Sequence, residues 1–354
     1  MAEFTAAVQL IFTIIIGMYF FMRLRNESGN EKAAVQDGKR EAERINRMRH
    51  ISLTEPLTEA ARPTEMSGII GQDNGVRALK AALCGKNPQH VLIYGPPGVG
   101  KTAAARLALE EAKKSPSTPF AKNAKFIEAD ATIMRFDERS IADPLIGSVH
   151  DPIYQGAGAF GDAGIPQPKE GAVSKAHGGV LFIDEIGELP PVQLNRLLKV
   201  LEDRKVYFES AYYSENNKKI PTYIHDIFQN GLPADFRMIG ATTKSPNDIP
   251  EAIRSRCVEV FFNELNRSDI IKILENARVM IGLALADGVI EYIADYARNG
   301  RDSVKILQTL SNTVSLDGRY IAELKDAEWV IKTGHYTKND AKIIDISFVK
   351  TKNN

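Results

Sequence analysis

Short apolar runs alternate with segments of helical periodicity through the middle of the chain, and turn residues separate them. The runs have the length and apolar content of buried strands. The pattern therefore predicts an α/β fold, a parallel sheet with flanking helices. The expected strands are 90–94, 125–129, 179–184 and 236–240, and the expected helices are 102–111 and 191–202.

After residue 265 the pattern predicts helices alone. Apolar residues recur at helical spacing, Ser268 is the expected N-cap, and breaks are expected at Gly282 and Gly300. These signals predict a small all-helical domain behind the α/β domain. The expected boundaries are 66–264 for the α/β domain, 265–335 for the helical domain and 336–354 for a polar tail.

The N-terminal residues have a different character. Residues 4–22 carry no charge and, as a helix, would span roughly 28 Å, close to the thickness of a bilayer core. Arg23 and Arg25 follow this run, so the positive-inside rule places the rest of the chain in the cytoplasm. We expect residues 1–25 to be an uncleaved single-pass anchor in the cell membrane. A signal peptide and a buried helix are the alternatives.

A charged segment, 26–65, is expected to tether the anchor to the α/β domain. Its most basic part, 40–49, could lie near anionic lipid headgroups or form a solvated linker.

Composition narrows the class of protein. The 354 residues are 44% hydrophobic and 25% charged, which is ordinary for a globular protein. The 45 basic and 45 acidic residues balance, so no nucleic-acid partner is expected. Cys84 and Cys257 are far apart in sequence, which argues against a disulfide framework and for a reducing compartment.

The most informative motif fills the turn between the first strand and its helix. Gly95-Pro96-Pro97-Gly98-Val99-Gly100-Lys101-Thr102 fits the phosphate-binding pattern G-x-x-x-x-G-K-[ST]. Glycines let backbone N–H groups face phosphate oxygens, and the helix N-terminus adds partial positive charge. Lys101 is expected to reach the β- and γ-phosphates, and Thr102 to ligate Mg²⁺. The predicted ligand is ATP or a close relative, with Mg²⁺.

A second motif adds hydrolysis to binding. The strand 179–184 ends in Asp184 and is followed by Glu185. Together with an upstream phosphate-binding loop, the first acid is expected to hold Mg²⁺ with Thr102. Glu185 is the expected general base that orients and polarises the attacking water.

Further polar candidates follow the later strands. Thr243 is expected to contact the γ-phosphate or the attacking water, with Thr242 as a strand-end hydroxyl. Arg256 is the preferred arginine for a neighbouring subunit's γ-phosphate, and Arg254 is the second choice. Arg301, which opens a helix of the helical domain, either touches the nucleotide or is a solvated charge.

The order of these motifs resembles the AAA+ ATPases, in which an α/β module is closed by a helical lid. Residues 95–102, 181–185, 240–243 and 255–257 carry the resemblance. Segments 145–152, 176–190 and 231–236, with the predicted anchor, are more similar to the membrane-anchored bacterial B branch of the Lon-type ATP-dependent proteases. The resemblance covers about residues 1–335.

This resemblance implies a homo-hexameric ring with ATP at subunit boundaries and axial loops that pull on unfolded or misfolded proteins. It places the substrate-gripping loop at Leu145 and Ile146, with Tyr154 and Phe160 as secondary candidates. Tyrosines and phenylalanines within 206–233 either cover a subunit interface or grip something in a channel. The serine–lysine peptidase domain that follows the lid in the family has no counterpart here, so a truncated or partial protease is expected.

Two other classes share some of these motifs. Residues 158–163 and 178–190 also resemble the enhancer-dependent transcription activators, but Gly161 replaces their loop threonine and no helix-turn-helix follows the lid. A clamp loader or branch-migration motor would share 241–243 and 255–257, but the chain shows no DNA-facing basic patch.

Overall fold

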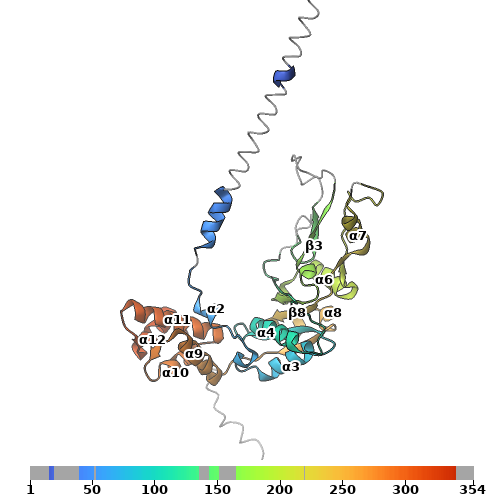
Figure 1. The fold of residues 1–354 in the computed structure, drawn as a ribbon. Coiled ribbons are helices and arrows are strands. Elements are labelled where there is room, and N and C mark those ends of the chain that lie inside the picture. Colours follow the sequence, from blue (N-terminus) through green and yellow to red (C-terminus); the bar gives the residue numbers. More distant parts are fainter. Residues whose placement is uncertain are drawn as a thin grey trace, which may run out of the picture. The chain divides into compact units, whose positions relative to one another are not determined.

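The computed structural model describes residues 16–19, 40–51, 53–134, 143–150, 165–218 and 220–339 (Figure 1). The chain divides into two units, 1–56 and 57–354. In the first unit, residues 16–19 and 40–49 are helical. Within the described parts of the chain, no helix is both long and apolar enough to span a bilayer, and most of the predicted span 4–22 lies outside those parts.

The second unit is built on a five-stranded parallel sheet. The strands are β1 (His90–Tyr94), β2 (Phe126–Asp130), β5 (Val180–Asp184), β8 (Arg237–Thr242) and β9 (Cys257–Phe261). Their order in the sheet is β2-β5-β8-β1-β9, so β1 lies between two strands from much later in the chain. The four predicted strands are confirmed, whereas β9 was not predicted.

Alternate residues of each strand enter two hydrophobic cores. Val91 and Ile93 of β1 join the core that contains α3 (Asp73–Leu83) and α4 (Lys101–Lys114). Leu92 and Tyr94 join the core that contains α6 (Pro191–Asp203) and α8 (Glu251–Arg254). The sheet is therefore covered by helices on both faces, which explains the apolar runs of β1, β5 and β8.

Two excursions leave the α/β module on the α6 side. The first is the antiparallel pair β3 (Gly147–His150) and β4 (Gln167–Glu170). The second runs from β6 (Lys205–Val206) through α7 (Thr222–Asn230) to β7 (Leu232–Pro233). Figure 1 shows both projecting in the same direction from the sheet.

Aromatic residues of the second excursion have two environments. Tyr213 stacks on Phe228 with ring centroids 4.3 Å apart, and its hydroxyl is 3.0 Å from Nδ1 of His225. Tyr207, Tyr212 and Tyr223 are exposed. The first set stabilises the excursion itself, so a role at an interface or in a channel is left to the exposed tyrosines.

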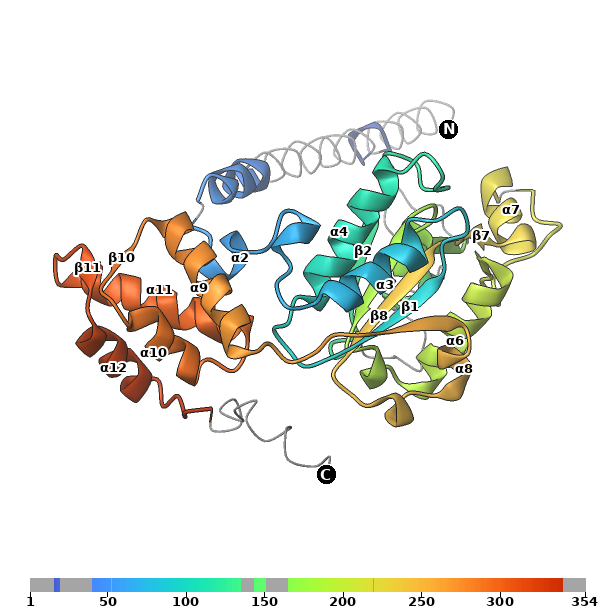
Figure 2. The same cartoon turned by 90° about the horizontal axis from the view of Figure 1, so that it is seen from below.

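The helical lid consists of α9 (Arg267–Ile281), α10 (Val289–Tyr296), α11 (Gly300–Leu316) and α12 (Leu324–Thr333), which gather together in Figure 2. Asn266, not the predicted Ser268, caps α9. Its side chain accepts a hydrogen bond from Asp269 N, and the Asp269 carboxylate accepts one from Asn266 N. Ser268 donates to Asn266 instead. Gly282 ends α9, as predicted, and has the left-handed conformation.

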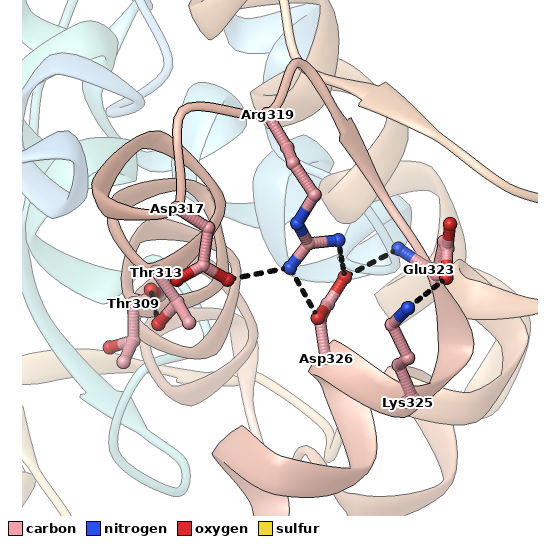
Figure 3. A network of polar contacts seen from close by, with 7 residues as sticks. All are labelled: Thr309, Thr313, Asp317, Arg319, Glu323, Lys325 and Asp326. Atoms are coloured by element: carbon pink, nitrogen blue, oxygen red, sulfur yellow. Dashed lines mark hydrogen bonds and ion pairs between the residues drawn. The ribbon is translucent and has the colours of Figure 1, made fainter.

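One arginine joins the end of α11 to the start of α12 (Figure 3). Arg319 donates to both carboxylate oxygens of Asp326, at 2.8 and 2.7 Å, and to Asp317 at 2.8 Å. Asp326 also accepts from Glu323 N, which closes the first turn of α12. A bidentate pair of this kind fixes an angle between two helices as well as a distance.

The residues that follow α12 still contact the lid. Tyr336 packs against the lid core, and Asn339 hydrogen-bonds to the backbone oxygens of Asp295 and Ala297 at 2.9 and 2.8 Å. Residues 336–339, expected to begin a polar tail, are thus docked on α10. The rest of that predicted tail lies outside the described residues.

Candidate nucleotide site

The turn between β1 and α4 has the backbone that a phosphate-binding loop requires. Gly98 and Gly100 have φ of 72° and 94°, a region that side chains with a Cβ rarely adopt. Gly100 directly precedes α4, so the free N–H groups of the first helical turn face the loop. The loop also contacts the lid, because Gly300 N donates to Gly98 O at 3.1 Å.

Lys101 lies inside this loop. Its side chain is 8% exposed, and Nζ donates to the carbonyl oxygens of Gly95 at 2.5 Å and Pro96 at 3.1 Å. Burial lowers the pKa of the ammonium, while the nearby carboxylates of Glu185 and Asp184 raise it. An ammonium that is bound only by carbonyl dipoles in a partly dry loop can exchange them for phosphate oxygens, which carry full charge.

The two acids of the second motif lie at the end of β5. Asp184 is half-buried, and burial raises the pKa of its carboxyl group, which the hydrogen bond from Glu185 N at 3.1 Å partly opposes. Glu185 adopts the left-handed conformation, with φ of 47°. This turn points the two consecutive side chains in different directions, so each has its own partners.

Thr243 holds the side chain of Glu185. Its backbone N and its Oγ1 both donate to Oε2 of Glu185 at 3.1 Å. Thr242 is buried, and its hydroxyl accepts from Lys244 N within the same turn. The structure therefore brings Thr243, and not Thr242, to the predicted general base.

A cavity of about 270 Å³ connects these groups. Gly98, Lys101 and Thr102 line it together with Asp184 and Glu185, while α9, α11 and the segment around α2 (Leu57–Ala60) form its other walls. Arg301 lines the cavity from α11, and its positive charge contributes to the lowered pKa of Lys101. Arg301 therefore lies near the candidate nucleotide site, which favours the interpretation that it touches the nucleotide over that of a solvated charge.

The segment near α2 was not predicted to contribute to the site. Thr58, Glu59 and Arg62 line the cavity, and Arg62 forms an ion pair with Glu59 at 2.8 Å. Leu57 is buried in the core that contains α3 and α4, and this burial holds the short helix in place. Its sequence is short and charged, so only its packing on α11 distinguishes it from a linker.

The two candidate arginines lie away from this cavity. Arg256 is exposed, donates to the Ala252 carbonyl at 2.6 Å and forms an ion pair with Glu202. Arg254 is less exposed and donates through Nε to Glu259 at 2.7 Å. Neither side chain lines the cavity of its own chain.

The predicted gripping residues are not accessible where the structure describes them. Leu145 and Ile146 are 0% and 8% exposed and belong to the second core. Their N–H groups donate to Oδ1 of the buried Asp143 at 3.0 and 2.9 Å, which folds the turn inward. A side chain that grips a substrate must reach it, so this arrangement does not support that role. Tyr154 and Phe160 lie outside the described residues.

Comparisons with known proteins found a family model, solved structures and curated relatives that are similar to this chain. Residues 65–222 match the family model of magnesium chelatase, subunit ChlI. The structure is similar to that of a RuvB mutant from Thermotoga maritima, with a TM-score of 0.53 and 19% identity over 77% of this chain and 73% of the other, which shows the fold alone. The chain is 58% identical to Lon protease 2 of Bacillus subtilis over 337 residues, 95% of its length.

The chain is thus a relative of Lon protease 2 and has an α/β P-loop fold of the AAA+ type. Its fold is that of an ATP-hydrolysing module, which implies nucleotide binding. It spans 61% of the length of Lon protease 2. It is also 31% identical, over 61% of its length, to the protein YifB of Salmonella typhimurium. The transcription-activator alternative is not favoured, because the similarity to Lon protease 2 covers nearly the whole chain.

Proposed function

We propose that this AAA+ module uses ATP hydrolysis to unfold and move protein substrates as part of an ATP-dependent protease. The observation that carries the proposal is the contact of Glu185 with both donors of Thr243, beside Asp184 and Lys101 in one cavity. In this arrangement the loop binds phosphates, and the carboxylate of Glu185 is oriented by a fixed pair of donors. The similarity to Lon protease 2 supports the kind of work to which hydrolysis is coupled.

Each residue then has a distinct role in the proposed reaction. Lys101 exchanges its carbonyl partners for the β- and γ-phosphates, and Arg301 approaches the nucleotide from the lid. Glu185 accepts a proton from the attacking water, which Thr243 helps to align. Thr102 and Asp184 would hold Mg²⁺, which neutralises charge on the phosphate oxygens when bound.

Arg256 completes the site from a neighbouring copy. In its own chain it lies outside the cavity, and its partner Glu202 is exposed. An exposed ion pair contributes little, so Arg256 can leave it for a phosphate at low cost. We propose a ring, six copies as in the family resemblance, in which each Arg256 faces the next chain's γ-phosphate.

The remaining parts of the proposal concern location and partners. The uncharged residues 4–22 anchor the chain in the cell membrane, and the ATPase module faces the cytoplasm. The partners are unfolded or misfolded proteins, and the exposed tyrosines of the second excursion are available to contact them.

A single assay tests the proposal. Purified protein is incubated with ATP, Mg²⁺ and a fluorescent protein carrying an unfolded tag, and ATP turnover, unfolding and peptide release are followed together. Unfolding that stops in the Glu185→Gln variant would support the proposal. ATP turnover without any unfolding in an assembled ring would contradict it.

A further inference from the structure

The side chains of Arg254, Glu259 and Tyr94 link the turn that carries Arg256 to the phosphate-binding loop of the same chain. Arg254 donates through Nε to Oε1 of Glu259 at 2.7 Å, and the Tyr94 hydroxyl donates to the same oxygen at 3.2 Å. The Tyr94 ring also stacks on Phe261, with centroids 5.2 Å apart and planes 17° from parallel. One carboxylate oxygen thus holds both a guanidinium and a phenol.

The three residues come from α8, β1 and β9, so their contact joins these elements. Arg254 is the last residue of α8, two residues before Arg256. Tyr94 is the last residue of β1, and Gly95 of the phosphate-binding loop follows it. Glu259 lies between them on β9, which pairs with β1. A displacement of α8 therefore acts directly on the strand end from which the loop emerges.

The charges of the three groups favour the contact. Arg254 lowers the pKa of the Glu259 carboxyl group through its hydrogen bond, which keeps the carboxylate ionised. Burial and Glu259 raise the pKa of Tyr94 to about 12, which keeps the phenol protonated as a donor. The side chains of Arg254 and Glu259 are 32% and 28% exposed, against 38% and 54% for Arg256 and Glu202. The carboxylate that holds Arg254 is therefore more buried than the one that holds Arg256.

We propose that Arg254 is a positioning residue which, through Glu259 and Tyr94, fixes the turn carrying Arg256 relative to the phosphate-binding loop of the same chain. The inference rests on the proposed function, because it assumes that Arg256 acts on a neighbour's nucleotide. It adds a route within one chain. The position of Arg256, which acts at the neighbouring chain's site, is coupled to the phosphate-binding loop of the chain that carries it.

The test compares steady-state ATP hydrolysis by full-length Arg254→Met, Glu259→Gln, Tyr94→Phe and the Arg254→Met/Glu259→Gln double variant. Each single change should lower kcat by about three- to tenfold while KM for ATP changes less than about twofold, because orientation is lost and binding is kept. The double variant should be no slower than the slower single variant. Arg267→Met is the matched control, because it removes a similarly exposed ion pair, with Asp295, from the lid.

The direction in which Glu259→Gln changes kcat decides whether Arg254 positions Arg256 or contacts the neighbour's phosphate itself. If Arg254 itself contacted the neighbour's phosphate, weakening its hold on Glu259 would leave kcat unchanged or raise it, and that result would overturn the proposal. Multiplicative losses in the double variant would overturn it as well. Tyr94→Phe keeps the ring on Phe261, so it retains a readout if the other variants fold poorly. Normal turnover by Arg256→Ala would instead refute the proposed role of Arg256 at a neighbour's nucleotide.

Discussion

Replacing Gly98 with alanine should destabilise the protein at the contact between the phosphate-binding loop and the lid. Gly98 has φ of 72°, and a Cβ built there would lie 2.5 Å from Oδ1 of Asn299, which caps α11 by accepting from Asp302 N. The left-handed conformation costs alanine about 1 kcal/mol. Displacing the Asn299 cap costs about 1 kcal/mol more. The total of about 2 kcal/mol corresponds to a melting temperature lower by about 4 °C for a module of this size.

Gly282→Ala is the matched control for backbone strain. Gly282 has φ of 63°, and a Cβ there would meet nothing within 4 Å, so only about half of the loss is expected. The Gly98→Ala/Asn299→Ala double variant should be no less stable than Gly98→Ala, because the cap is lost in both. Equal melting temperatures for Gly98→Ala and Gly282→Ala in thermal denaturation would refute the reasoning.

Three further predictions concern the site and the lid. Glu185→Gln should bind ATP with unchanged affinity in a fluorescent-nucleotide titration while turnover nearly ceases; normal turnover would remove Glu185 as the base. Thr243→Val keeps one of the two donors to Glu185, so kcat should fall by about tenfold with little change in ATP affinity, whereas a large affinity loss would indicate a different role. Arg319 lowers the pKa of Asp326 to about 2, so this carboxylate stabilises the lid above its ordinary pKa near 4 and loses that effect as pH falls toward 2. Asp326→Asn should therefore lower the denaturation midpoint at pH 7 and approach the unmodified protein near pH 2; a pH-independent difference would contradict this.

Local sequence patterns predicted much of the core fold. The run 90–94 and the glycine-rich turn after it identify β1 and the loop, because a buried strand, a turn and a helix each leave a signal within a few residues. The same is true of β5, where two acids follow an apolar run. Thr243 could be chosen over Thr242 only from the expected strand end, and the structure places it on Glu185.

Residues that depend on distant contacts could not be predicted in this way. Leu145 and Ile146 look like exposed loop residues in sequence, but the buried Asp143 turns them into the core. The short helix around Thr58 enters the cavity wall only because α11 lies beside it. The partnership of Tyr94 with Glu259 joins residues 165 positions apart. No periodicity within a single element reports such contacts.

The position of β1 between β8 and β9 determines when the nucleotide site can form during synthesis. Both neighbours of β1 lie far along the chain, since it pairs with Arg237–Thr242 and Cys257–Phe261. At a translation rate of about 5 to 20 residues per second, roughly 7 to 30 seconds separate the appearance of Tyr94 from that of Thr242, which completes the first of the two neighbours. Throughout that interval the apolar strand His90–Tyr94 has no sheet partner, so the ribosome-bound chain exposes an aggregation-prone segment that early chaperone binding would protect.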